Sequence, residues 1–182
     1  MAWIGVVGEK SQELAAVIAD LFERAGQPSG QSSGQLPGQR HTLIDLERQE
    51  TELPMDVLAA LENSRTAQKH IAALGEGSML IMNPDHKDIL EQAGRSRGLL
   101  ITFGLNNKDC VTASSVMENE IQICVQRDLP TLSGGKLEQQ EFGVRMDTEK
   151  KDPEVLLAAL TTVLICGASV EKLQVLNQSR GE

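Results

Sequence analysis

Two short apolar runs, separated by a segment long enough for a helix, constrain the fold of this sequence more than any other feature. The runs lie at 79–82 and 99–103, and the turn Asn83-Pro84-Asp85 directly follows the first of them. Apolar runs of four or five residues between turn residues are typical of buried parallel strands in an α/β sheet. We therefore predict strands at 78–82 and 99–103 and a helix at 87–93.

The N-terminal segment predicts a strand, a turn and a helix. An apolar run at 2–7 ends at Gly8, and Ser11 is predicted to cap a helix that ends at Gly26. The following segment, 27–40, consists of Gly, Ser, Gln and Pro with almost no apolar residue. Such a composition buries too little surface to offset the entropy of ordering, so we predict a flexible loop there.

The rest of the chain predicts a mixed sheet. A strand is expected at 41–46, and the apolar periodicity from Pro54 to Leu74 predicts one long helix. Alternating patterns predict antiparallel strands at 111–116, 121–125 and 141–146. Pro153 begins a predicted amphipathic helix that ends near Gly167. The predicted fold class is therefore a three-layer α/β domain, with a mainly parallel sheet flanked by helices and antiparallel strands in its C-terminal part.

The length of the chain is that of one compact domain. With 182 residues it can bury a core without disulfides or metal ions. We expect a single domain over 1–176, which includes the loop 27–40, and a disordered tail at 177–182.

Charge and composition exclude several classes of function. A net charge of -9 and a pI near 4.9, without a local basic patch, disfavour nucleic-acid and membrane partners. Three widely spaced cysteines, Cys110, Cys124 and Cys166, are typical of free thiols in a reducing compartment. No apolar stretch approaches the roughly 20 residues that span a bilayer. We expect a cytoplasmic protein.

Two strand-end turns hold the candidate binding residues. Gly8, Lys10 and Ser11 follow the first strand, where α/β folds bind phosphates, although a helix-capping Ser11 beside a solvated Lys10 explains the same residues. Asn83 and Asp85 could contact a ligand in a crevice at the end of another strand, but turn chemistry and helix capping also select them.

Metal binding and nucleophilic catalysis have little support in the sequence. Asp85, His86 and Asp88 could ligate a metal, but they lack partners at ligand spacing, and helix capping and the helix dipole explain both aspartates. The serine and threonine pairs have no neighbouring base, so no residue is predicted to be a catalytic nucleophile. We therefore predict neither a metal site nor catalytic residues.

The order of these motifs resembles the central domain of the Mur ligases and their folylpolyglutamate synthase relatives. The matching segments are Leu80-Ile81-Met82-Asn83-Pro84-Asp85, Ile101-Thr102-Phe103-Gly104-Leu105, Lys69 and the closing helix with Leu157-Ala158-Ala159-Leu160. The resemblance extends from about Trp3 to Leu173 and is strongest over 66–116. It implies ATP and Mg²⁺ as cofactors and the joining of an amino acid to a carboxylate through an acyl phosphate.

The chain departs from that family where nucleotide binding is concerned. In the family's phosphate loop a glycine precedes the lysine, whereas Glu9 precedes Lys10 here. The family positions that frame the nucleotide before the last helix fall on Lys151, Asp152 and Val155 and do not match. A carboxylate at the loop would repel a triphosphate.

These departures lead to one hypothesis and two alternatives. The hypothesis is a catalytically inactive Mur-ligase-like domain without a cofactor, serving as a binding or assembly module in a bacterial cytoplasm and acting through a protein partner or self-association. A cell-envelope or sporulation setting rests on analogy with the family. The first alternative is an ATP-dependent amide ligase or ATPase subunit completed by a partner chain, and the second is a sensor of an anionic metabolite.

Overall fold

The computed structural model describes residues 1–26, 30–31, 41–148 and 151–174. Most of the predicted loop 27–40 and all of the predicted tail 177–182 lie outside the described residues. No helix in the described part of the chain is long and apolar enough to cross a membrane.

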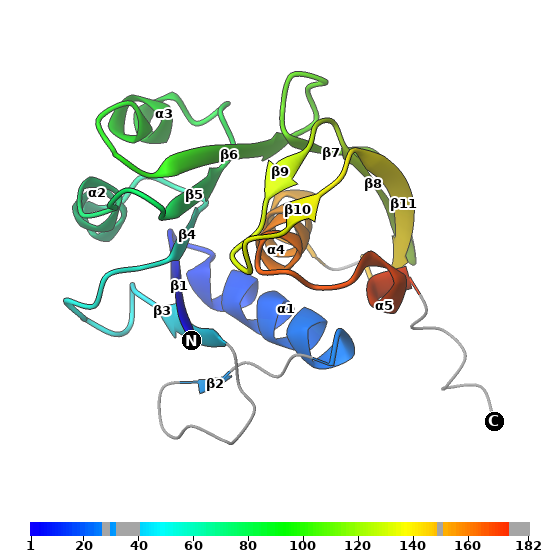
Figure 1. The fold of residues 1–182 in the computed structure, drawn as a ribbon, viewed down its shortest axis with the longest axis horizontal. Helices are drawn as coiled ribbons and strands as arrows, with labels where there is room; N and C mark the ends of the chain where they lie inside the picture. The colour runs from blue at the N-terminus through cyan, green and yellow to red at the C-terminus, as the bar shows by residue number, and fades with distance from the viewer. Residues whose placement is uncertain (27–29, 32–40, 149–150, 175–182) are drawn as a thin grey trace.

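Nine of the described strands form one sheet (Figure 1). From one edge to the other the order is β11-β8-β7-β6-β5-β4-β1-β3-β2. The strands are β1 (Ala2–Val7), β2 (Gly30–Gln31), β3 (His41–Asp45), β4 (Val57–Ala60), β5 (Met79–Met82), β6 (Leu99–Gly104), β7 (Val111–Met117), β8 (Glu120–Val125) and β11 (Gln140–Arg145). Pairing is parallel from β2 to β7 and antiparallel from β7 through β8 to β11. This confirms the predicted mixed sheet.

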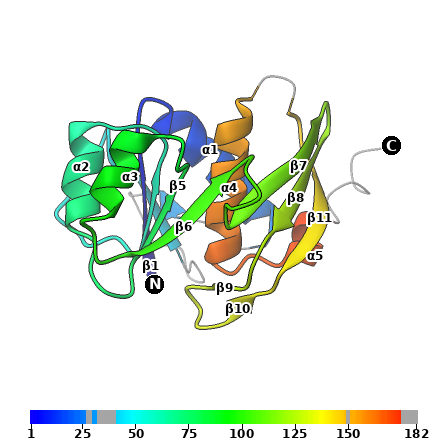
Figure 2. The ribbon, with the colours of Figure 1, turned by 90° about the horizontal axis from the view of Figure 1, so that it is seen from above.

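Helices cover the two faces of the sheet unequally (Figure 2). The helices are α1 (Ser11–Arg24), α2 (Arg65–Ala72), α3 (Lys87–Ala93), α4 (Pro153–Ile165) and α5 (Val170–Gln174). Apolar residues of α1 and α4 pack on one face, and those of α2 and α3 pack on the other. Successive residues of β4 and β5 alternate between these two clusters, because neighbouring side chains of a strand point to opposite faces.

The predicted long helix from Pro54 to Leu74 is wrong. The structure places strand β4 at Val57–Ala60, between β1 and β5, and starts α2 only at Arg65. All four residues of β4 are buried, and the Ser64 hydroxyl accepts a hydrogen bond from the Ala67 N–H at 2.9 Å. A short buried strand next to a helix has the same apolar composition as a longer helix, so periodicity alone did not separate them.

The predicted amphipathic character of the last helix is also wrong. Every residue of α4 from Val155 to Ile165 is buried, because the helix lies against α1 and across the middle of the sheet. The hydroxyls of Thr161 and Thr162 donate to backbone carbonyls of their own helix at 2.7 and 2.8 Å, which satisfies these buried polar groups.

A small hairpin lies between β8 and β11 along the chain. The strands β9 (Leu129–Pro130) and β10 (Lys136–Leu137) pair antiparallel, and Gly134 adopts a φ of 76° in the turn between them. Gly134 and Gly135 therefore lie in a hairpin turn.

Candidate functional site

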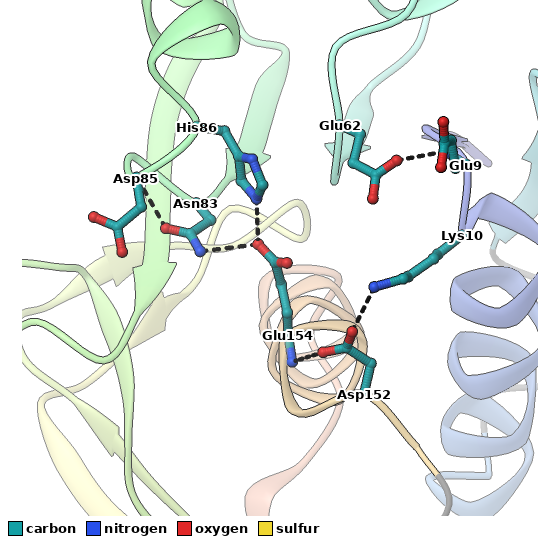
Figure 3. A network of polar contacts seen from close by, with 8 residues as sticks. All are labelled: Glu9, Lys10, Glu62, Asn83, Asp85, His86, Asp152 and Glu154. Carbon is teal, nitrogen blue, oxygen red and sulfur yellow. Dashed lines mark hydrogen bonds and ion pairs between the residues drawn. The ribbon is translucent and has the colours of Figure 1, made fainter.

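The turns that follow β1, β4 and β5 lie together at the carboxyl ends of these central strands, beside the start of α4 (Figure 3). Parallel strands present their carboxyl ends on one side, where open α/β sheets place ligands. The side chains that meet there, here called the strand-end cluster, are Glu9, Lys10, Glu62, Asn83, Asp85, His86, Asp152 and Glu154. All five candidate residues from the sequence therefore lie at these strand ends: Lys10, Asn83 and Asp85 belong to the cluster, and Gly8 and Ser11 flank Glu9 and Lys10.

The turn after β1 requires a glycine at Gly8. Its φ is +114°, and an added Cβ would lie 2.9 Å from the backbone nitrogen of Glu62. The Ser11 N–H donates to the Gly8 carbonyl at 3.0 Å, which closes a tight turn into α1.

Ser11 does not cap α1, so that prediction is wrong. The N-cap is Lys10, which makes no side-chain capping hydrogen bond, and Ser11 is the first helical residue with only 4% of its surface exposed. The tight turn at Gly8 places the helix start one residue earlier along the chain than the capping pattern implies.

Two carboxylates of the chain accept hydrogen bonds from backbone N–H groups of this turn. Glu47 accepts a hydrogen bond from the Gly8 N–H at 3.2 Å, and Glu62 accepts one from the Glu9 N–H at 3.3 Å. These are the kind of backbone groups that hold phosphate oxygens at a strand-to-helix turn.

Glu47 is held firmly in its charged form. Burial favours a higher pKa for its carboxyl, but hydrogen bonds from Ser64, Thr66 and the Gly8 N–H outweigh burial and lower that pKa. Glu47 is therefore ionised at neutral pH, and its negative charge lies beside the turn.

Lys10 is held away from the turn by an ion pair. Its Nζ lies 2.5 Å from Oδ2 of Asp152, and the other oxygen of Asp152 caps α4 by accepting the Glu154 N–H at 2.8 Å. The hydrogen bond with Asp152 raises the pKa of Lys10, and the same bond lowers the pKa of Asp152. Lys10 is thus partly exposed to solvent, but it also has a partner that the sequence did not indicate, because Asp152 from a distant helix neutralises its charge.

The turn after β5 is tied to the same helix. Oε1 of Glu154 accepts a hydrogen bond from Nδ2 of Asn83 at 2.8 Å and lies 2.7 Å from Nε2 of His86 (Figure 3). The other end of the Asn83 amide accepts the Asp85 N–H at 3.0 Å, which forms an Asx turn. Asn83 and His86 therefore hold Glu154, and the start of α4 joins the two halves of the strand-end cluster.

Asp85 does not cap α3, so the capping prediction is wrong for this residue as well. The N-cap of α3 is His86, without a side-chain capping bond. Among residues 1–26, 30–31, 41–148 and 151–174 no group of three or more His, Cys, Asp or Glu side chains is arranged to hold a metal ion.

Other residues that the sequence singled out lie outside the cluster. Lys69 pairs with Glu50 and Glu52, at 3.6 and 2.8 Å, on the exposed side of α2. The three cysteines are free thiols in the structure, and burial strongly raises the pKa of Cys166. An unreactive, buried thiol fits a structural role in α4.

Sequence reasoning missed the acceptors that decide the character of the site. Glu62 stands in the turn after β4 and was hidden by the predicted long helix, although Ser64 carries a capping signal. Glu47 lies 39 residues from Gly8 along the chain, so only the sheet order brings the two together. Asp152 was noted as a departure from the family, but its contact with Lys10 has no sequence signal.

No family model and no curated protein sequence matches this chain, whereas solved structures do. Murein peptide ligase Mpl from Psychrobacter arcticus 273-4 superposes with a TM-score of 0.67 at 8% identity, over 96% of this chain and 46% of that one. Folylpolyglutamate synthetase from Lactobacillus casei superposes with a TM-score of 0.62 at 9% identity, over 95% of this chain and 61% of that one. The fold is that of a Mur-ligase-like domain.

A third similar structure is MurF ligase from Thermotoga maritima in complex with ADP, with a TM-score of 0.60 at 12% identity. The superposition covers 96% of this chain and 48% of that one. The Mur-ligase-like chain thus spans between 46% and 61% of these three structures. At such identities the similarity establishes the fold.

The residues of this Mur-ligase-like domain do not fit a magnesium-bound nucleotide. A triphosphate at the turn after β1 would compete with Glu47 and Glu62 for the backbone donors and with Asp152 for Lys10. The side chain of Glu9 adds a further negative charge beside them.

Proposed function

We propose that this Mur-ligase-like domain is catalytically inactive and serves as a binding or assembly module in a bacterial cytoplasm. The observation that carries the proposal is the occupation of the turn after β1 by the chain's own carboxylates. Glu47 and Glu62 accept its backbone N–H groups, and Asp152 holds Lys10.

Electrostatics supports the loss of nucleotide binding. Two unit charges 4 Å apart interact by about 4 kcal/mol at an effective dielectric constant of 20. Glu9, Glu47 and Glu62 would all repel a triphosphate at the turn. Lys10 could offset this only after its ion pair with Asp152 had broken. The net charge of -9 makes the surrounding field unfavourable for polyanions as well.

The open face of the sheet supports a role in assembly. On β8 and β11 the residues that alternate with the core, such as Gln122, Cys124 and Gly143, remain partly exposed, and on β7 Ser115 and Met117, which pair with Gln122 and Glu120, are exposed. The similar structures are longer than this chain. A protein partner or a second copy is the kind of ligand that such a face accommodates, and a cell-envelope setting follows by analogy with the murein ligase.

Calorimetric titration with Mg-ATP tests the proposal. We expect no binding stronger than millimolar for the wild-type chain. The test variant is Lys10→Ala, and Lys136→Ala is the matched control, because Lys136 forms an ion pair with Asp128 on the distant hairpin. Binding stronger than millimolar that disappears in Lys10→Ala and persists in Lys136→Ala would overturn the proposal.

The second candidate is an ATP-dependent amide ligase or ATPase completed by a partner chain. It is favoured by the Lys10-Ser11 pair, which stands at the start of α1 directly after the glycine turn. If Mg-ATP binds through Lys10, phosphate release in the presence of a carboxylate and an amino acid distinguishes a ligase from a sensor that binds an anionic metabolite without turnover.

A further inference from the structure

Strand β11 forms one edge of the main sheet (Figure 1). Among the described strands it pairs with β8 alone, in a continuous antiparallel register of six residues. In an antiparallel pair the backbone groups of alternate residues point to the same neighbour, so half of those in β11 point away from β8. The outer side of β11 is therefore a template on which a further strand can pair.

β11 lacks the features by which edge strands usually avoid such pairing. Its sequence, Gln140–Arg145, contains no proline and no lysine. Its register with β8 has no bulge, whereas the neighbouring β7–β8 pair is irregular between Ala113 and Ser115. No charge points into the core from β11, because its inward residues are Phe142 and Val144. A regular, unprotected edge of this length is open to strand addition.

The sequence of β11 is complementary to itself. Glu141 and Arg145 lie on the open face of the sheet, on either side of Gly143, while Phe142 and Val144 belong to the core. If two copies of β11 pair antiparallel with Gly143 at the centre, Glu141 of each copy lies opposite Arg145 of the other. Phe142 then lies opposite Val144 on the core side. Opposite charges and apolar side chains that face each other across two strands stabilise their pairing.

The charges select this register over its neighbours. A shift of two residues keeps every side chain on its own face but places Glu141 opposite Gly143 or opposite Asp147. The first shift loses the ion pair, and the second brings two carboxylates together. A register centred on Gly143 is therefore favoured among those that preserve the two faces.

Glu141 and Arg145 are accessible to a second copy, although each has a contact in its own chain. Glu141 is exposed and accepts a hydrogen bond from the Ser114 hydroxyl at 2.9 Å. The side chain of Arg145 is 58% exposed, and its Nε lies 3.8 Å from Oε2 of Glu120. Exposed pairs of this kind contribute little to stability. Across an interface such charges mainly set the register and the choice of partner, while the backbone hydrogen bonds supply affinity.

We propose that β11 pairs antiparallel with β11 of a second copy of this chain, about a two-fold axis at Gly143, so that the two sheets become continuous. In such an isologous contact the same strand supplies both sides, so the outward backbone groups of each copy pair with those of the other. The inference rests on the assembly role proposed above, and it names the partner and the surface.

Sedimentation velocity of the full chain, at concentrations up to about 1 mM, tests the dimer. We expect a concentration-dependent equilibrium between monomer and dimer. Glu141→Arg and Arg145→Glu should each weaken the dimer by about ten-fold or more, because each places like charges opposite one another twice. The matched controls are Glu91→Arg and Arg95→Glu, which reverse the charges of an exposed ion pair on α3, and they should dimerise as the wild type does.

A mixture of the two β11 variants separates a lost contact from a misfolded chain. Glu141→Arg and Arg145→Glu chains are complementary to each other, so an equimolar mixture should form heterodimers of wild-type affinity although each variant alone associates weakly. The double variant with both changes should dimerise as the wild type does for the same reason. A variant that failed to fold would not be rescued in either experiment.

Three results would overturn this pairing: a wild-type chain that stays monomeric up to about 1 mM, a dimer that both charge reversals leave intact, or a mixture of the two variants that does not associate. None of them bears on whether the turn after β1 binds a nucleotide. Mg-ATP binding through Lys10 would instead overturn the proposed inactivity and leave the β11 pairing standing.

Discussion

The two halves of the sheet differ in how their faces are covered. Around β4 and β5 both faces are covered, by α1 and α4 on one side and by α2 and α3 on the other. Around β7, β8 and β11 only the face toward α4 and α5 is apolar, and the other face is polar and partly exposed. The first half fixes the strand-end cluster, while the second leaves an area free for a partner.

The largest expected effect contrasts the packing of these halves. Leu58→Ala, in the doubly covered half, should lower the free energy of unfolding by about 2–5 kcal/mol, because a fully buried side chain leaves a cavity. Met117→Ala, on the open face of β7 opposite Glu120 and with 51% of its surface exposed, should change it by no more than about 0.5 kcal/mol. Urea unfolding of both variants measures the difference. If both variants lost the same free energy of unfolding, the face that is exposed in the structure would be packed against something in solution.

A smaller effect is expected at the turn after β1. Gly8→Ala combines a left-handed φ with a Cβ 2.9 Å from a backbone atom and should cost about 1–3 kcal/mol. Gly77→Ala is the matched control, since Gly77 also has a positive φ but open space around an added Cβ. Unfolding of the two variants separates conformational strain from the contact with Glu62. If Gly77→Ala proves as costly as Gly8→Ala, the close approach of the β4 turn contributes nothing.

The ion pair between Lys10 and Asp152, which joins the starts of α1 and α4, should have a modest, pH-dependent effect on stability. The pKa of Asp152 is lowered in the folded chain, so its contribution to stability is complete above the unfolded pKa of about 4 and is lost as the pH falls through the folded pKa. Asp152→Asn retains a capping side chain but loses the charge, so its stability should fall less than that of the wild type between pH 5 and pH 2. Thermal unfolding across this range measures the difference. Parallel pH profiles would show that Lys10 and Asp152 are not coupled in solution.

Removing the capping side chain should cost more stability than removing its charge alone. Asp152→Ala deletes both the contact with Lys10 and the hydrogen bond to the Glu154 N–H, and N-cap losses cost about 0.5–2 kcal/mol. Urea unfolding at pH 7 should rank Asp152→Ala below Asp152→Asn in stability. The reverse order would indicate that the backbone bond at the start of α4 is unimportant.

Local patterns predicted much of the fold. The strands near 78–82 and 99–103, the helix at 87–93 and the antiparallel strands were recognised because each apolar run ends in turn residues that match its structure. The segment from Pro54 to Leu74 failed, since four buried residues followed by a helix have the periodicity of one longer helix.

The site was less predictable than the fold. Gly8, Lys10, Asn83 and Asp85 could be named because they directly follow strands. Their partners could not, because the contacts of Lys10 with Asp152 and of Asn83 with Glu154 span 142 and 71 residues. Such contacts depend on strand order and on where α4 begins, and no local pattern encodes either.

The central claim is that the chain's own carboxylates occupy the turn where a Mur-ligase-like fold would hold phosphate. A crystal structure determined after soaking in Mg-ATP tests it most directly. We predict that Lys10 stays on Asp152 and that Glu47 and Glu62 stay on the N–H groups of Gly8 and Glu9, with no nucleotide bound there. A triphosphate wrapped by the turn, with Lys10 on a phosphate oxygen and Mg²⁺ on the Ser11 hydroxyl, would contradict the account.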